Sequence, residues 1–386
     1  MKVLALGGAG AMGRVAVRVA TGLPGVQEIV VADRDAHAAA RLAQELGASG
    51  VRMSAREVDV TDEAELDAAL KEADIVLNTV GPYYRFGLGV LRAAIRTRTH
   101  YLDICDDWEP TLEMLDLDAD ARVAGVCAVI GMGASPGISN LLAARAVTRL
   151  DTVTDLYTAW PVDVPGAGAD DTDLRGPDGR PIAAAVHWMQ QIRGTIAVVS
   201  NGELVQRQPL RPVALTLPGG RKGTAYTVGH PEPVTLQRSY RPTGDAANLM
   251  VITPGTVAYL DVLRSDLDSG RLTNETAAAD LAKPTMRRAL RAAVRAVRFS
   301  APGSLPPFFA AATGTRNGRP LTVLAHLVST GGLMKNMSEA TGIPAAAGLA
   351  QLLDGTVVQE STRRKRSSIP SASSPTWPSW PSQSGS

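Results

Sequence analysis

The chain has 386 residues, more than one ordinary hydrophobic core accommodates, so its length predicts two domains. Hydrophobic residues make up 45% and charged residues 20%, values typical of a soluble globular protein, and a net charge of +1 excludes recruitment of nucleic acid or an anionic membrane by an overall field. The two cysteines exclude a disulfide framework, the N-terminus enters a strand without a signal peptide, and no long uncharged apolar run occurs, so we expect a reduced, cytoplasmic protein.

A glycine-rich stretch follows the first predicted strand, residues 2–6. Gly8, Gly10 and Gly13 fit the pattern G-x-G-x-x-G, and helical composition begins at Arg14. In this motif the first glycine permits a tight turn, the second lets the backbone approach a pyrophosphate, and the third lets the helix pack on the strand. The helix N-terminus then faces the phosphates. Candidate cofactor-binding residues here are Gly8, Gly10, Ala11, Met12 and Gly13.

Strands and helices alternate as far as residue 150. The predicted strands are 2–6, 28–32, 51–58, 74–80, 100–104 and 126–130, and the helices between and after them are 14–20, 36–47, 63–72, 87–96, 110–124 and 138–150. Such alternation predicts βαβ crossovers and a doubly wound parallel sheet of order 3-2-1-4-5-6. Residues 1–150 are therefore expected to form an α/β Rossmann domain that binds NAD(P).

The pattern changes after residue 150 to short strands and turns. Residues 153–162, 195–200, 203–209, 213–217, 224–228, 234–238, 308–315 and 321–328 are predicted as strands, with hairpins at the Asn-Gly pairs 201–202 and 317–318. Residues 182–193 and 276–297 are predicted as helices, the second broken at Pro284. We expect residues 151–330 to form an α+β domain on an antiparallel sheet, which would bind substrate.

Three further segments complete the predicted organisation. Residues 166–181 form a Gly/Asp/Pro-rich loop, long enough for a lid or a mobile insertion. A helix at 340–353, within the segment 331–359, is expected to return the chain to the nucleotide domain. Residues 360–386 lack periodicity and are interpreted as a disordered tail, whose basic run 363–366 is a solvated face more readily than a nucleic-acid site.

Ligands of such sheets lie beyond the carboxyl ends of the strands. Asp33 can accept a hydrogen bond from the adenosine ribose and repel a 2′-phosphate, whereas Arg34 could bind that phosphate. NAD is therefore slightly preferred, with NADP as the alternative. The other candidate cofactor-binding residues end strands three and four: Asp59, Val60, Asn78, Gly81 and Pro82.

The ends of strands five and six supply the candidate catalytic and substrate-binding residues. The candidates for catalysis are Asp106, Tyr83 and Asp103, and those for substrate binding are Cys105, Asp107, Gly133, Ser135, Pro136 and Gly137. Carboxylates could hold a substrate amine or transfer a proton, and N–H groups of the turn 133–137 could hold a carboxylate. Three alternatives stay open: Asp106 and Asp107 could simply cap the following helix, Asp103 points away from Asp106 by strand alternation, and Cys105 could be a small buried residue.

The histidines give a weaker signal. His100 begins a strand and is interpreted as structural. His230 and Glu232 lie in a proline-rich turn that could present them to a cleft or be an ordinary turn. No histidine–cysteine spacing predicts a metal site.

Together these motifs resemble the saccharopine dehydrogenase (saccharopine reductase) family, including lysine-6-dehydrogenase-like members. The matching stretches are GGAGAMG at 7–13, ADR at 32–34, NTVGPYYRFG at 78–87, HYLDICDD at 100–107 and GASPGISN at 133–140, with weaker matches at 194–203, 229–236 and 341–348. The resemblance implies a nucleotide domain combined with an α+β domain that binds substrate and forms a homodimer. It also places residues 103–107 and 133–137 on the substrate side. The turn DICDD departs from the small hydroxylated residues of saccharopine-forming members, which puts saccharopine itself in doubt as the substrate.

The expected activity is NAD(P)-dependent hydride transfer at a CH–NH or CH–NH₂ carbon of an amino acid or opine-like conjugate, within amino-acid metabolism. Two alternatives remain: a non-catalytic NAD(P)-binding or sensing protein, and an oxidoreductase acting on a lipid-linked ketone or enoyl group. The expected partner is a small amino-acid-like substrate, with no nucleic acid, no membrane and no metal.

Overall fold

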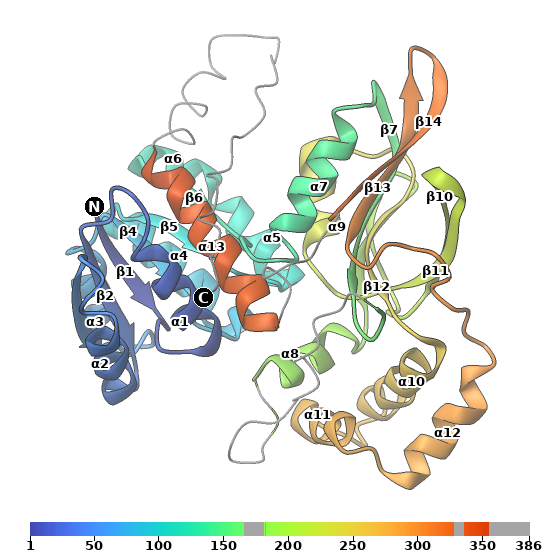
Figure 1. The fold of residues 1–386 in the computed structure, drawn as a ribbon, viewed down its shortest axis with the longest axis horizontal. Coiled ribbons are helices and arrows are strands. Elements are labelled where there is room, and N and C mark those ends of the chain that lie inside the picture. Colours follow the sequence, from blue (N-terminus) through green and yellow to red (C-terminus); the bar gives the residue numbers. More distant parts are fainter. Residues whose placement is uncertain (166–180, 182, 328–335, 355–386) are drawn as a thin grey trace, which may run out of the picture.

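Two β-sheets organise the chain, and they lie apart in the computed structural model (Figure 1). The structure describes residues 1–165, 181, 183–327 and 336–354. The first part contains β1 (Lys2–Leu6), α1 (Ala11–Ala20), β2 (Glu28–Asp33), α2 (Ala36–Glu45), β3 (Arg52–Glu57), α3 (Glu63–Leu70), β4 (Ile75–Asn78), α4 (Tyr83–Thr97), β5 (His100–Asp103), α5 (Trp108–Asp116), α6 (Asp118–Ala124), β6 (Ala128–Val129) and α7 (Ile138–Val147).

The second part follows directly in the chain. It contains β7 (Thr152–Pro161), α8 (Ala183–Gln191), β8 (Ile196–Ser200), β9 (Glu203–Arg207), β10 (Pro212–Leu217), the 3₁₀ helix η1 (Pro218–Gly220), β11 (Arg221–Thr227), α9 (Glu232–Tyr240), β12 (Ala246–Val251), α10 (Pro254–Asp268), α11 (Asn274–Ala282), α12 (Met286–Ala296), β13 (Phe309–Arg316), β14 (Arg319–His326) and α13 (Met337–Leu353). Among the described residues, no helix has the length and apolar character needed to cross a membrane.

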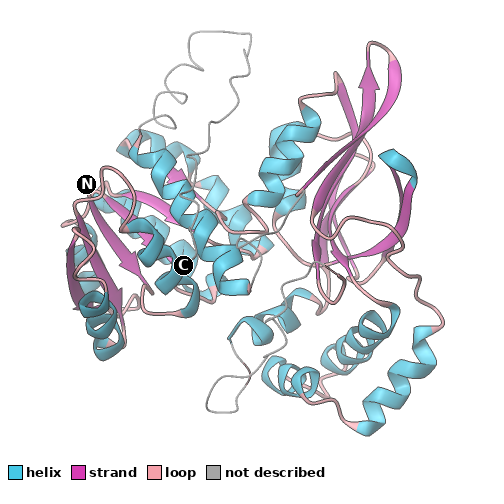
Figure 2. Ribbon diagram, in the orientation of Figure 1, coloured by secondary structure: helices cyan, strands magenta, loops and turns pink. Residues whose placement is uncertain are grey.

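The first sheet has six parallel strands in the order β3-β2-β1-β4-β5-β6, which confirms the predicted doubly wound topology. Strands β1 and β4 are almost wholly buried, because helices cover both faces of the sheet (Figure 2). One core lies between the sheet and α1, α2 and α13, and the other between the sheet and α3, α4 and α5. Asp62 caps α3 by accepting hydrogen bonds from the N–H groups of Ala64 and Glu65.

The second sheet has eight strands. Its main path is β10-β11-β12-β7-β13-β14, and β8 pairs with both β12 and β9. The described pairings are antiparallel except that of β7 with β12, which is parallel, so the sheet is mixed. Both predicted Asn-Gly hairpins are confirmed: Asn201 and Gly202 have φ of 51° and 80°, and Asn317 and Gly318 have φ of 50° and 72°.

Two element predictions need correction, and the predicted break at Pro284 is confirmed. Residues 234–238 form part of helix α9 and are not a strand. Residues 110–124 divide into α5 and α6, and the predicted helix 276–297 divides into α11 and α12 around Pro284, as its proline predicted. Strand β12 and helix α10 were not predicted. The predicted loop 166–181, apart from Pro181, and the tail 360–386 lie outside the described residues.

Two helices each pack on the sheet that they do not follow in the sequence. Helix α13 lies against α1, where a Cβ on Gly342 would stand 2.7 Å from the carbonyl oxygen of Met12, so only glycine permits this approach. Helix α7 packs through Ala143 and Ala146 onto the second sheet. This packing brings α7 into contact with the second sheet, and the domain boundary at residue 150 stays a prediction.

Candidate active site

The glycine loop joins β1 to α1 and has the shape of a phosphate cradle. Gly7, with φ of 67°, makes the turn, so this role belongs to Gly7 rather than to Gly8. A Cβ on Gly13 would lie 2.4 Å from the carbonyl oxygen of Gly7, which leaves no room for a side chain. Helix α1 begins after Gly10 without a side-chain cap, so its first N–H groups, at Ala11 and Met12, suit a pyrophosphate. These residues fit a dinucleotide.

The acidic and basic residues at the ends of β2 and β3 border this loop. The carboxylate of Asp33 accepts hydrogen bonds from the backbone N–H of Ala9 at 3.3 Å and of Asp35 at 3.2 Å. Hydrogen bonds from Thr61 hold the pKa of Asp59 below its usual range, and the nearby charge of Arg34 lowers this pKa further. Arg34 itself is exposed. Val60 is half-buried beside them. The carboxylate and the guanidinium are thus both available to an adenosine.

The residues at the end of β4 differ in accessibility: Asn78 is buried, whereas Gly81 is exposed. Asn78 is fully buried: its amide nitrogen donates to the hydroxyl of Tyr101 at 3.1 Å, and its amide oxygen accepts from the N–H of Val80. Its side chain therefore braces β4 against β5, which corrects the predicted contact with cofactor. Gly81 is exposed, and a Cβ added to it would have no neighbouring atom within 4 Å; Pro82 follows it at the start of α4.

Two of the predicted catalytic residues, Tyr83 and Asp103, are buried, and their side chains form hydrogen bonds within the protein. The Tyr83 hydroxyl donates to the carbonyl oxygen of Asn78 at 2.8 Å. Asp103 is fully buried and accepts from the Tyr101 hydroxyl at 2.6 Å and from the N–H groups of Cys105 and Gly131 at 3.0 and 2.7 Å. Burial raises the pKa of Asp103 to about 6. The geometry makes both residues positioning residues that fix the strand ends, which corrects the prediction.

Cys105 is fully buried, and burial raises the pKa of its thiol well above the usual value. Its sulfur contacts the carbonyl oxygen of Asp107 and the hydroxyl of Thr111, each at 3.7 Å. A buried, protonated thiol is a weak nucleophile and has no access to a substrate, so the small-buried-residue alternative fits better than substrate binding.

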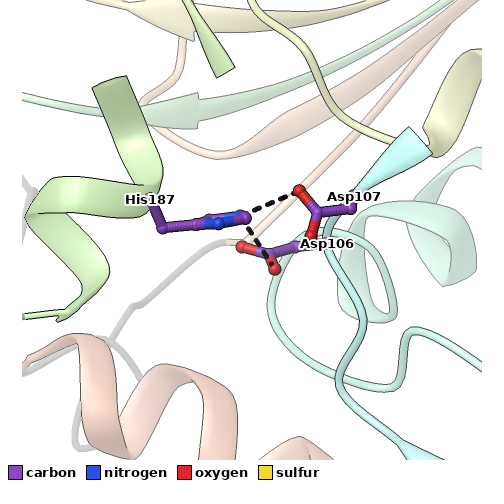
Figure 3. A group of neighbouring side chains, drawn as sticks. All are labelled: Asp106, Asp107 and His187. Carbon is purple, nitrogen blue, oxygen red and sulfur yellow. Dashed lines mark ion pairs between the residues drawn. The ribbon is translucent and has the colours of Figure 1, made fainter. Parts of the chain in front are cut away.

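Asp106 and Asp107 meet a histidine from the other part of the chain. His187, on α8, places its Nε2 atom 3.2 Å from a carboxylate oxygen of Asp106 and 3.3 Å from one of Asp107. Figure 3 shows the imidazole directed at both carboxylates, which follow β5. The side chain of Asp107 is 4% exposed and that of Asp106 is 35% exposed, so Asp106 is the carboxylate open to a ligand.

The imidazole of His187 and the two carboxylates alter one another's pKa. Burial alone would lower the pKa of His187, but the two carboxylates outweigh it and raise that pKa to about 9. Burial raises the pKa of Asp107 to about 6. Burial also opposes ionisation of Asp106, yet the neighbouring His187 prevails and lowers its pKa. Near neutral pH the cluster therefore holds two carboxylates around one imidazolium.

Neither aspartate caps the following helix. Asp107 stands at the N-cap of α5 but makes no side-chain capping hydrogen bond, and its carboxylate instead accepts from the N–H of Tyr84 at 3.2 Å. Asp106 accepts from the amide nitrogen of Gln191 at 3.3 Å, one turn along α8 from His187. The functional interpretation of these aspartates is thus favoured over the capping alternative.

The turn after β6 uses its own N–H groups. Those of Gly133 and Ile138 donate to the carbonyl oxygens of Pro136 and Gly133, both at 3.0 Å, and that of Ser139 donates to Ala134 at 2.9 Å. Gly137, with φ of 112°, lies so close to Gly133 that a Cβ would stand 2.1 Å from its carbonyl oxygen. The N–H of Gly133 is therefore not free for a substrate carboxylate, and the role predicted for the rest of the turn 133–137 stays a prediction.

The same turn joins the second sheet through a buried glutamate. One carboxylate oxygen of Glu232 accepts from the hydroxyls of Ser135 and Ser139 and from the amide of Asn248, the last two at 2.7 Å. Its other oxygen faces Nδ1 of His230 at 3.5 Å. Glu232 is fully buried and His230 is 5% exposed, so they form an interdomain contact and not a presented turn. Ser135 thus has an identified partner within the protein.

A cation could also be held by this cluster. Donor atoms of Asp106, Asp107 and His187 all lie within 4.8 Å of one another, close enough to share one ion. The expected absence of a metal stays a prediction, and chelation tests it.

His187 could not be found from the sequence pattern. It lies 80 positions beyond Asp107 and directly after the long loop, so no local spacing links it to the aspartates. The one local feature that could have indicated a polar site is Gln191, which follows His187 by four residues and therefore lies on the same helix face. His100 is structural, as expected, since its Nδ1 accepts from the N–H of Cys127 at 3.1 Å.

Comparison with known proteins confirms the resemblance deduced from the motifs. Residues 3–129 match the family model described as the saccharopine dehydrogenase NADP binding domain. A saccharopine dehydrogenase [NADP(+), L-glutamate-forming] of Pyricularia oryzae is 30% identical over 93 residues, which are 24% of this chain and 20% of that protein. A mouse saccharopine dehydrogenase-like oxidoreductase is 43% identical over 49 residues, 13% of this chain and 11% of its own length.

The similarity in structure extends further than the similarity in sequence. Apo saccharopine dehydrogenase (L-Glu forming) from Saccharomyces cerevisiae superposes with a TM-score of 0.57 and 15% identity, covering 95% of this chain and 97% of that one. At this identity the likeness shows the fold. The sequence matches span a quarter or less of the curated relatives' own length.

Proposed function

We propose, from the match of residues 3–129 to the saccharopine dehydrogenase NADP binding domain, that the chain is an NAD(P)-dependent oxidoreductase. It would transfer hydride at a CH–NH or CH–NH₂ carbon of an amino acid or opine-like conjugate. The observation that carries this proposal is the ionic cluster of Asp106, Asp107 and His187, which lies beyond the carboxyl end of β5.

The nicotinamide, when bound, would accept or supply the hydride. The chain's own residues would position it: the N-terminus of α1 for the pyrophosphate, Asp33 for the adenosine ribose, and the exposed backbone at Gly81 for the other half. Because the adenosine lies toward β2 and β3, the reactive half extends toward β5. That direction leads to Asp106.

Amine recognition and proton transfer would fall to the cluster. Asp106, the more exposed carboxylate, would accept a charge-assisted hydrogen bond from a substrate ammonium. In the direction that forms the amine, the His187 imidazolium would donate its Nε2 proton to the substrate nitrogen, and in the reverse direction the neutral imidazole would accept that proton. Asp107 stays fixed by the N–H of Tyr84 and keeps the imidazole oriented. Since His187 comes from α8, the second part of the chain completes the site.

Cofactor choice would depend on two adjacent residues. The carboxylate of Asp33 favours a free ribose 2′-hydroxyl, whereas Arg34 favours a 2′-phosphate. We propose that the chain accepts both dinucleotides and that Asp33 limits its affinity for NADP. The match to an NADP binding family supports acceptance of NADP.

The activity is tested by offering amino acids with oxidised cofactor, and keto acids with amines and reduced cofactor, while following the absorbance of the reduced nicotinamide. Amino-acid-dependent turnover, unchanged after treatment with a chelator, supports the proposal. His187→Asn should abolish turnover, and His37→Asn, at an exposed histidine on α2, serves as the matched control. Cofactor binding without turnover on any such substrate would favour the sensing alternative.

The placement of cofactor has its own test. Gly10→Val puts a branched side chain at the exposed start of α1 and should abolish dinucleotide binding while the fold survives. Gly22→Val makes the same change at an exposed position with no atom closer than 3.6 Å to the new Cβ, and should bind normally. Sedimentation equilibrium of the same samples tests the predicted homodimer.

A further inference from the structure

Helices α10, α11 and α12 form a layer at the margin of the second part of the chain, distant from the nucleotide fold (Figure 1). A cavity of about 460 Å³ opens there. Four arginines, one threonine and one aspartate line it: Arg271, Arg287, Arg288, Arg291, Thr285 and Asp266. Nothing in the proposed hydride transfer uses these residues.

Three of the four arginines, Arg271, Arg288 and Arg291, are held in place by buried carboxylates. Asp266 is 1% exposed and accepts from Nε of Arg288 and Nη1 of Arg291, both at 2.9 Å, and it pairs with Nε of Arg271 at 3.2 Å. Burial opposes its ionisation, but the hydrogen bonds from Arg291 and Arg288 prevail and lower its pKa. Asp280 fixes the second arm of Arg288 at 2.7 Å. The guanidinium groups are thus pre-organised by buried carboxylates.

Positive charge remains after this pairing. Arg287 is exposed and has no ion pair within the described part of the chain. Arg271 and Arg291 share the one carboxylate of Asp266 with Arg288. Helix α12 also begins at this cavity, and its N-cap Thr285 makes no side-chain capping hydrogen bond. The helix N-terminus therefore adds to the field of the arginines.

We propose that this cavity binds a phosphate group. Several guanidinium groups in fixed orientation match the geometry of phosphate oxygens, and the helix N-terminus favours an anion at the same place. The cavity volume lies within the usual range of small-ligand sites. The phosphate could belong to a soluble metabolite or to a lipid headgroup.

An apolar stripe on α12 distinguishes these two sources. Met286, Leu290, Val294 and Val297 are exposed by 76%, 63%, 75% and 88%, and their spacing of four, four and three residues places them on one helix face. A phospholipid bound at the cavity could lay its acyl chains, or the bilayer surface, against this stripe. A soluble phosphate would make no use of it.

The test titrates the full-length Gly10→Val protein, whose nucleotide fold should not bind a pyrophosphate, with inorganic pyrophosphate by calorimetry. Arg287→Gln should weaken pyrophosphate binding by roughly fivefold or more, the scale of one charge-assisted hydrogen bond. Arg298→Gln removes an exposed arginine at the far end of the same helix, outside the cavity lining, and should leave binding unchanged. Thermal melting of both variants checks the fold.

A second arm identifies the source of the phosphate. Wild type is sedimented with phosphatidylcholine vesicles that do or do not contain phosphatidylglycerol. Co-sedimentation that needs phosphatidylglycerol, is lost in a Leu290→Ser, Val294→Ser variant and is displaced by pyrophosphate identifies a lipid headgroup; pyrophosphate binding without co-sedimentation identifies a soluble phosphate. The proposal fails if neither probe binds, or if Arg298→Gln weakens binding as much as Arg287→Gln does.

Discussion

At the residue scale, His187 links Asp106 and Asp107, because the imidazole lowers the pKa of both carboxyl groups and both carboxylates raise the pKa of the imidazole. Asp107 is buried and fixed, whereas Asp106 is half-buried and the more accessible of the two. This asymmetry assigns the two aspartates different tasks. In the proposed mechanism, Asp107 orients the imidazole and Asp106 receives the ligand.

The first prediction separates these tasks. Asp106→Asn keeps a hydrogen-bonding side chain but removes the charge that an ammonium needs, so substrate affinity or turnover should fall about tenfold or more while cofactor affinity is kept. Steady-state kinetics and cofactor titration measure both. Asp116→Asn, at an exposed aspartate that ends α5, is the control. Unaltered kinetics in Asp106→Asn would remove this residue from the site.

The second prediction concerns Asp33. Its replacement by alanine removes the negative charge that disfavours a 2′-phosphate and leaves Arg34 in place. The ratio of NADP to NAD affinity should rise by about tenfold, on the scale of one charged interaction. Fluorescence titration of both dinucleotides measures the ratio. An unchanged ratio would mean that the carboxylate, already bonded to the N–H of Ala9, does not face the ribose.

At the element scale, the first sheet was predictable because each strand and helix carries its own local signal. Buried runs, capping residues such as Asp62, and the glycine motif all agree with the doubly wound order. Helix α9 was not predictable in this way, since its Val-Thr-Leu run favours a strand while Pro231 and Pro233 at its start favour a helix. Tertiary contacts of Glu232 decide between the two.

Strand β12 and part of the candidate site also lack a local signal in the sequence. Strand β12 is buried along its whole length, because it is central in the second sheet and pairs with β7, β8 and β11, so it shows no alternation. Asp106 and Asp107 were found because they follow a strand. His187 was not found, since only the packing of α8 against the first part of the chain brings it to them.

The third prediction tests the contact that α9 makes with the turn after β6. Glu232→Ala removes the acceptor that Ser135, Ser139 and Asn248 share, and should destabilise the protein by roughly 2 to 4 kcal/mol. Glu232→Gln keeps an oxygen acceptor and should lose less. Thermal melting of both variants checks this order, and equal stability of all three proteins would show that the contact contributes nothing.

At the scale of the whole molecule, two interdomain contacts hold the parts of the chain together near the site. The first is the contact of Glu232 with Ser135 and Ser139, and the second is the ionic cluster that links the loop after β5 to α8. The ionic cluster differs from the first contact because its charge changes within an accessible pH range. It therefore couples the stability of the interdomain contact to pH.

The last prediction follows from the pKa of His187, which is raised to about 9 from an ordinary value of 6.5. A raised histidine pKa stabilises the folded state fully below its unfolded value, and that stabilisation is lost as the pH rises through the folded value. Asp107, with a pKa of about 6, is already ionised throughout this upper window, and Asp106 has its pKa lowered, so neither cancels the change. Between about pH 7 and pH 10 the wild type should lose on the order of 2 kcal/mol more stability than His187→Asn, which has no imidazole to deprotonate.

Thermal melting of both proteins across this range gives the two slopes of stability against pH, and hydrogen exchange at α8 and at the loop after β5 localises the loss. Parallel slopes would show that the imidazolium does not hold the two parts together.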